Sequence, residues 1–184
     1  RKGREIAFFK DIEFSRIFMA WQIPCSKDQK NILGYEIISS ILTDGRNSIL
    51  NRNLKEDKQI VESIYSGIQP GEFGSLFIIE ASLKRENIRK VEDIISKLLQ
   101  KLLTNSDLNN KIKKALRIVK SNYIFNLETS SQLSQFYGNH LLWGRLNPQI
   151  ELSKNFKYWK STENLKKLIK SLLQDKFTFI AYKT

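Results

Sequence analysis

The sequence predicts an α+β fold in which a largely antiparallel sheet packs against helices on one face. Three observations support this fold class. Strand-like segments come in two neighbouring pairs, and each pair is joined by a short polar connection. Longer segments with apolar residues at helical spacing follow each pair. A last segment of alternating apolar and polar residues ends the chain and predicts a closing strand.

The first pair of strands is predicted at residues 4–10 and 14–23, which are rich in β-branched and aromatic side chains. Apolar residues occupy both alternating faces of the second strand, and we therefore expect it to be covered on both sides. Pro24 ends this strand. Asp28 then stands where a helix cap belongs, before a segment whose apolar residues repeat at helical spacing up to Leu42.

The middle of the chain predicts a short helix, a second strand pair and another helix. The turn at Asp44-Gly45 precedes the short helix, at about residues 49–58. The strands are expected at residues 60–68 and 75–83, with the loop Gln69-Pro70-Gly71-Glu72 between them. From Asn87 onward, apolar residues repeat at helical spacing to Leu102.

The last third predicts one long helix, a loop, a final helix and the closing strand. No proline occurs from about residue 110 to 144, and Lys113, Arg117 and Lys120 form a basic stripe that we interpret as the solvated face of this helix. Asn147-Pro148 ends it. The final helix is expected at residues 162–174 and the strand at 176–183.

Composition indicates a single globular domain, residues 1–184. Hydrophobic residues make up 41% and charged residues 27%, which excludes a disordered chain. No apolar run approaches the ~20 residues of a membrane span, so we expect a soluble protein of the cytoplasm or periplasm, with no membrane partner. The chain opens on RKGR without methionine, and we expect it to be part of a longer polypeptide. The single Cys25 excludes an internal disulfide and a cysteine-based metal site.

An ordered set of local patterns resembles the second, non-catalytic domain of the pitrilysin/insulinase (M16) family of zinc metallopeptidases. A helix leads into a glycine-containing turn, then a serine-leucine pattern, then a leucine-basic-glutamate pattern, and then a strand. These correspond to Gly45, Asn47-Ser48-Ile49-Leu50, Leu54-Lys55-Glu56 and the strand from Ile60. Further along, Tyr123 to Glu128 and then Tyr137-Gly138 resemble the family's long helix, and the closing helix and strand match as well.

The resemblance implies a supporting role in a zinc metalloendopeptidase rather than catalysis by this chain. In the family, an inverted His-x-x-Glu-His motif in the first domain binds zinc. This chain has one histidine, His140, and cannot supply two such ligands. We therefore expect no catalytic residue and no metal here, and zinc in the parent's first domain or in a partner. The implied partners are a peptide or unfolded polypeptide substrate, the preceding M16 domain and an M16 partner subunit.

Two positions correspond to the arginine and tyrosine with which non-catalytic halves of the family hold the substrate backbone. Counted from Leu54, they are Lys55 and Glu62. Lysine keeps the positive charge but lacks the planar fork of arginine, and glutamate cannot replace the phenolic hydrogen-bond donor. We interpret this substrate-binding pair as degenerate. Tyr65 is three residues away from the expected position and is a poor substitute.

Two alternatives remain open from the sequence. The first is a catalytically silent scaffold or partner subunit of the same fold, which the Lys55/Glu62 pair favours. The second is a basic nucleic-acid-binding module, based on the net charge of +12 and on the aromatic and lysine residues of 155–160. We instead expect residues 155–160 to be a loop whose aromatic side chains anchor on the core. A basic chamber wall would favour acidic or neutral peptides over basic ones.

Overall fold

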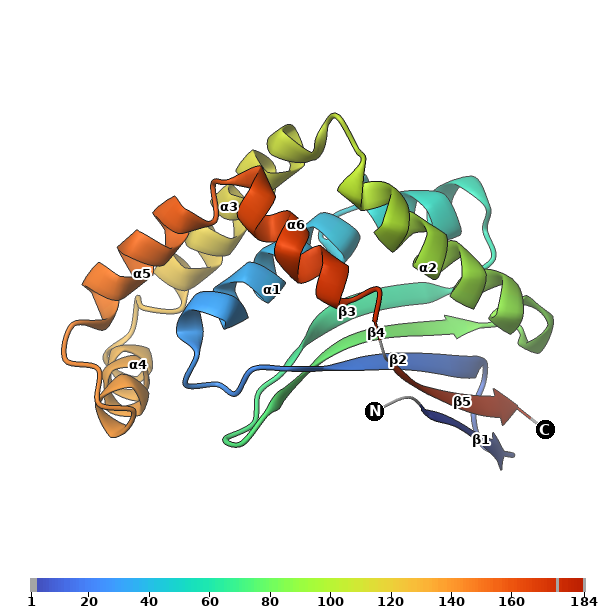
Figure 1. The fold of residues 1–184 in the computed structure, drawn as a ribbon. Coiled ribbons are helices and arrows are strands. Elements are labelled where there is room, and N and C mark those ends of the chain that lie inside the picture. Colours follow the sequence, from blue (N-terminus) through green and yellow to red (C-terminus); the bar gives the residue numbers. More distant parts are fainter. Residues whose placement is uncertain (1–2, 175, 184) are drawn as a thin grey trace.

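A computed structural model describes residues 3–174 and 176–183, and it confirms the α+β class. One five-stranded sheet lies below a layer of helices, which gather on a single face (Figure 1). The strand order is β1-β5-β2-β4-β3; β1 runs parallel to β5, and the other neighbours are antiparallel. The strands are β1 (Gly3–Phe9), β2 (Ser15–Ile23), β3 (Ser63–Gln69), β4 (Ser75–Leu83) and β5 (Phe177–Lys183).

The two faces of the sheet differ in burial. On β2, Ile17 and Met19 turn toward the helices and are buried. On the opposite face Arg16 is exposed, and Phe18 is only half-buried, beside the ring of Phe179 on β5 at a centroid distance of 6.0 Å. The expected cover on both sides of this strand is therefore wrong for this chain, because all the helices lie on one face (Figure 1).

The helical layer consists of six α-helices and two short helices among the described residues. They are α1 (Gln29–Thr43), the π-helical η1 (Asn51–Asp57), the 3-10 turn η2 (Arg85–Asn87), α2 (Ile88–Leu103), α3 (Leu108–Phe125), α4 (Ser130–Leu142), α5 (Pro148–Tyr158) and α6 (Thr162–Ser171). No helix among the described residues is both long enough and apolar enough to cross a bilayer.

Helix α1 forms the centre of the core. Asp28 caps it as predicted, accepting a hydrogen bond from the Asn31 backbone N–H at 3.2 Å. Leu33 and Ile37 are fully buried. The helix ends at the predicted turn because Gly45 adopts φ +80°, a left-handed conformation that glycine accommodates without strain.

The predicted helix at residues 110–144 is wrong as a single element, because the structure divides it into α3 and α4. Thr129 and Gln132 form a capping box: the Thr129 hydroxyl accepts the Gln132 backbone N–H at 3.3 Å, and the Gln132 side chain accepts the Thr129 backbone N–H at 3.2 Å. A capping box starts a new helix, so the chain can change direction at this point. Figure 1 shows α4 set apart from the other helices.

The expected loop at residues 155–160 is also wrong, since residues up to Tyr158 complete α5. The predicted anchoring of its aromatic side chains holds for Trp159, which is 2% exposed. Its indole N–H donates to the Lys30 carbonyl oxygen at 2.6 Å. The ring packs against Gly34 on α1, where a β-carbon would lie 2.6 Å from it. Trp159 thus packs the C-terminal helices against α1.

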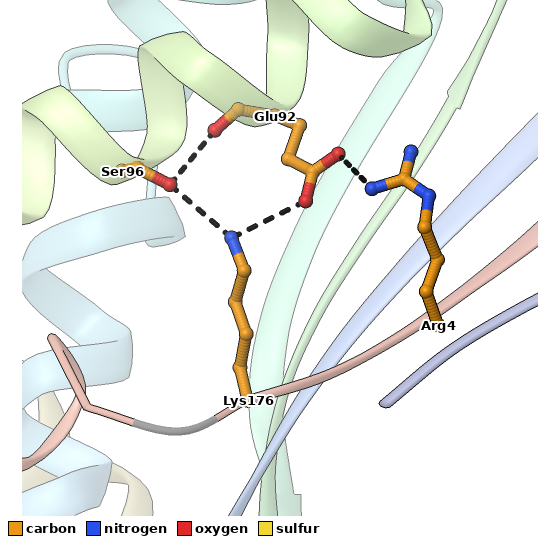
Figure 2. Close-up of polar contacts among 4 residues, drawn as sticks. All are labelled: Arg4, Glu92, Ser96 and Lys176. Carbon is orange, nitrogen blue, oxygen red and sulfur yellow. Dashed lines mark hydrogen bonds and ion pairs between the residues drawn. The ribbon is translucent and has the colours of Figure 1, made fainter. Parts of the chain in front are cut away.

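Glu92 of helix α2, whose side chain is 14% exposed, forms ion pairs with edge strand β1 and with the residue that directly precedes β5 (Figure 2). One carboxylate oxygen pairs with Arg4 of β1 at 2.9 Å, and the other pairs with Lys176 at 3.4 Å. Lys176 also donates to Ser96 at 3.2 Å. The cluster joins segments that lie at opposite ends of the sequence.

Candidate functional site

The first candidate site is a cavity of about 630 Å³ that we call the Glu36 cavity. Four elements border it: α1, the edge strand β3, α3 and α4. Helix α1 contributes Glu36, and β3 contributes Tyr65. The wall formed by α3 and α4 is rich in side-chain amides, namely Asn122, Asn126, Gln132, Gln135 and Asn139. The break between α3 and α4 therefore helps to form this cavity.

Glu36 lies in an unusual environment for a carboxylic acid. Its Oε1 atom accepts a hydrogen bond from the Tyr123 hydroxyl at 3.3 Å. Its Oε2 atom is shut off from solvent and has no hydrogen-bond partner among the described residues. Burial raises the pKa of Glu36 to about 7, and the Tyr123 hydrogen bond opposes this only in part. Burial, followed by the nearby Glu36 charge, raises the pKa of Tyr123.

The charge of the Glu36 cavity is opposite to that of the whole chain. Its lining contains the two acids Glu36 and Asp44 and no lysine, arginine or histidine. The chain carries 31 lysine and arginine residues against 19 acidic ones. The sequence prediction missed this site, although a signal was present: Glu36 is the lone acidic residue of helix α1 and stands between Tyr35 and Ile37, which are both buried.

Two hydroxyl side chains of α1 occupy the backbone hydrogen-bonding groups at the middle of the β3 edge, beside this cavity. The Ser66 backbone N–H donates to the Thr43 hydroxyl at 3.1 Å, and the Ser39 hydroxyl donates to the Ser66 carbonyl oxygen at 2.8 Å. Both outward-facing backbone groups of Ser66 are thus satisfied. A peptide strand added at this edge would have to displace these two side chains.

The structure places Lys55 and Glu62 outside the Glu36 cavity. Lys55 is exposed on η1, and Glu62 is exposed just before β3, where its backbone N–H donates to the Ser82 carbonyl oxygen at 2.8 Å. Neither side chain lines the cavity, whereas Tyr65 does. The role of the Lys55/Glu62 pair in substrate binding stays a prediction.

His140 lies in the last turn of α4 and is 6% exposed. Its ring contacts Phe136 and Trp143, at centroid distances of 4.5 and 5.4 Å. Burial and the positive charge of Arg145 lower the pKa of His140. Nowhere in the described part of the chain do three or more histidine, cysteine or acidic side chains cluster in a way that could hold a metal ion.

A second hollow, the basic groove, has a volume of about 510 Å³ and lies between α3 and α5. It combines two features that the sequence shows separately, because the basic stripe of α3 faces the lysines of residues 155–160. Its charged lining residues are all basic: Lys113, Arg117, Lys120, Lys157 and Lys160. Such a groove complements anions.

Comparison with known families decides the identity of the fold. The sequence matches the family described as "Peptidase M16 inactive domain" over residues 2–116. The chain belongs to this M16 family. No protein of curated function matches the sequence.

Solved structures resemble this M16 domain over nearly its whole length. A protease from Helicobacter pylori matches 97% of the chain with a TM-score of 0.83 at 18% identity. A peptidase M16 inactive domain from Pseudomonas fluorescens matches 100% with a TM-score of 0.82 at 14% identity. The periplasmic protease PqqL from Escherichia coli matches 100% with a TM-score of 0.71 at 12% identity. The M16 chain covers 43%, 44% and 21% of these structures, less than half of each.

Proposed function

We propose that this chain is the non-catalytic domain of an M16-type zinc metallopeptidase and helps to form a closed chamber that holds peptide substrates. The observation that carries this proposal is the match to the M16 inactive domain over residues 2–116. The similarity to proteases more than twice its length supports a companion domain. Under this proposal, bond cleavage belongs to the companion.

Zinc does not fit the residues of this chain, and we assign it to the preceding domain or to a partner subunit. The family site needs two histidines on one helical turn and a glutamate between them. His140 is the single histidine of the sequence, and its ring packs between the aromatic rings of Phe136 and Trp143. Cys25, the single cysteine, cannot complete a metal site alone.

The open face of the sheet is suited to form a chamber wall. Half-buried apolar side chains lie across it, including Phe18 and Ile78, and the exposed Tyr65 lies at its edge. The outer edge of β1 is paired with no other described strand. A substrate strand could add there by β-augmentation, whereas the β3 edge is closed at Ser66.

A catalytically silent M16 scaffold is the second candidate. The exposed Lys55 and Glu62 favour it, because they offer neither the guanidinium fork nor the phenolic hydroxyl with which the family holds substrates. A nucleic-acid-binding role is the third candidate, and only the basic groove favours it. It requires binding that is tight at physiological salt and falls steeply as salt is added.

The reading frame upstream of the Arg1 codon tests the proposal against the scaffold. We expect an inverted His-x-x-Glu-His motif within roughly one further domain of ~200 residues. A similar domain without these histidines would leave the scaffold or a subunit that depends on a catalytic partner. An unrelated upstream domain would contradict the proposed peptidase.

A further inference from the structure

We propose that the Glu36 cavity binds the positively charged end of a lysine or arginine side chain of a polypeptide. The chemistry required is an aliphatic ammonium or guanidinium group that reaches the Glu36 carboxylate. This inference is independent of the peptidase proposal, because it concerns a cavity formed by this chain alone.

The first argument is charge. A chain with a net charge of +12 repels cations over most of its surface. The Glu36 cavity is an exception, since its lining residues include two acids and no base. An incoming cation therefore meets attraction there that the basic groove on the other side of α3 cannot offer.

The second argument is the incomplete pairing of Glu36. A buried carboxylate needs a partner for each oxygen, and the ionised form is costly without them. Tyr123 satisfies Oε1 over 3.3 Å, while Oε2 has no partner among the described residues. A guanidinium or ammonium group in the cavity would place a positive charge beside this carboxyl group and favour its ionised form, and its N–H groups would meet the amide oxygens of the lining.

The third argument is the shape of the walls. Besides its polar side chains, the cavity lining includes apolar and aromatic residues, namely Phe136, Tyr65, Ile68 and Val119. A lysine or arginine side chain has a matching division into an apolar stem and a charged end. Aromatic faces also attract cations. A small inorganic cation would leave these walls unused.

Capped amino acids test the proposal directly. The protein is titrated at pH 8 with Nα-acetyl-arginine methylamide and with its neutral analogue Nα-acetyl-citrulline methylamide, and binding is followed by NMR. We expect the arginine compound to bind about tenfold more tightly or better, because only it carries the charge. Equal binding of the two compounds would overturn the proposal.

The Glu36→Gln variant tests the role of the carboxylate. It should remove the preference for arginine, whereas Glu163→Gln, which alters an exposed acid on α6, should retain it. Gln135→Lys should also abolish binding by placing a cation in the cavity. Ser134→Lys, on the same helix but outside the cavity lining, is its matched control. Arginine binding that survives both cavity variants would contradict the assignment.

The pH dependence and a polyamine complete the test. The other titratable groups that line the cavity are Asp44, Tyr65 and Tyr123. Arginine binding should therefore weaken about tenfold or more from pH 8 to pH 5.5, as Glu36 gains a proton.

Spermidine distinguishes the source of the cation. If spermidine binds tenfold more tightly than the capped arginine, the cavity is a site for free polyamines and the polypeptide assignment fails.

Discussion

Replacing Glu36 by glutamine should change how the stability of the domain depends on pH. Burial raises the pKa of Glu36 from its ordinary 4.5 to about 7. Between these values the folded state binds a proton that the unfolded state has already released. The contribution of this group therefore favours folding at low pH, and it is lost as pH rises from about 4.5 through 7.

The magnitude follows from linkage. Each pH unit of separation between folded and unfolded pKa corresponds to about 1.4 kcal/mol, so wild type should lose about 2.5 kcal/mol of unfolding free energy from this group between pH 5 and pH 8. This is an upper value, because Oε2 is closed to solvent but the residue as a whole keeps some exposure, and solvent screens part of its charge. The glutamine variant has no proton to lose and lacks this contribution.

Urea unfolding of both proteins at pH 5 and pH 8 measures the effect. We expect similar stability at pH 5 and a more stable variant at pH 8. The lowered pKa of His140 makes stability rise with pH, because the unfolded chain holds the proton of this group to higher pH than the folded chain does. That contribution is common to both proteins and cancels in their difference. A difference that stays constant from pH 5 to pH 8 would refute the reasoning.

Three further substitutions, one of them with a control, test the packing of the fold, each by the free energy of urea unfolding. Thr43→Val should cost about 1–3 kcal/mol, because it leaves the buried Ser66 N–H without an acceptor; no change would contradict the closed β3 edge. Gly34→Ala should cost about 1–3 kcal/mol by overlap with the Trp159 ring, whereas Gly138→Ala, in open space on α4, should be neutral or stabilising. Glu92→Gln should cost about 1–3 kcal/mol, and a full loss retained in 1 M salt would contradict an ionic cause.

The elements of the sheet and the core helices could be predicted because their signals are local. Alternation at residues 75–83 follows from burial of one face of β4, and the apolar spacing before Leu42 follows from the burial of α1 in the core; the structure confirms both elements. The α3–α4 break was missed although Thr129 and Gln132 carry the spacing of a capping box. The absence of proline permits a continuous helix but does not require one, and the capping box starts a new helix in the structure.

The Glu36 cavity could not be predicted from the sequence, because its parts are distant along the chain. Glu36 and Tyr123 are 87 residues apart, and only the packing of α1 against α3 brings them together. A lone glutamate between apolar neighbours indicates a buried acid, but it does not identify a partner. The basic groove is a similar case, since its two basic segments become one surface only through the packing of α5 beside α3.

Peptide hydrolysis by the complete polypeptide tests the central claim most directly. The proposed companion domain is assayed with zinc and an internally quenched peptide, alone and after addition of this domain. The account predicts that activity is absent without the domain, appears when it is added, and is removed by a zinc chelator. Full activity of the companion domain alone, or none in the reconstituted pair and in the intact polypeptide, would contradict a chamber-forming role.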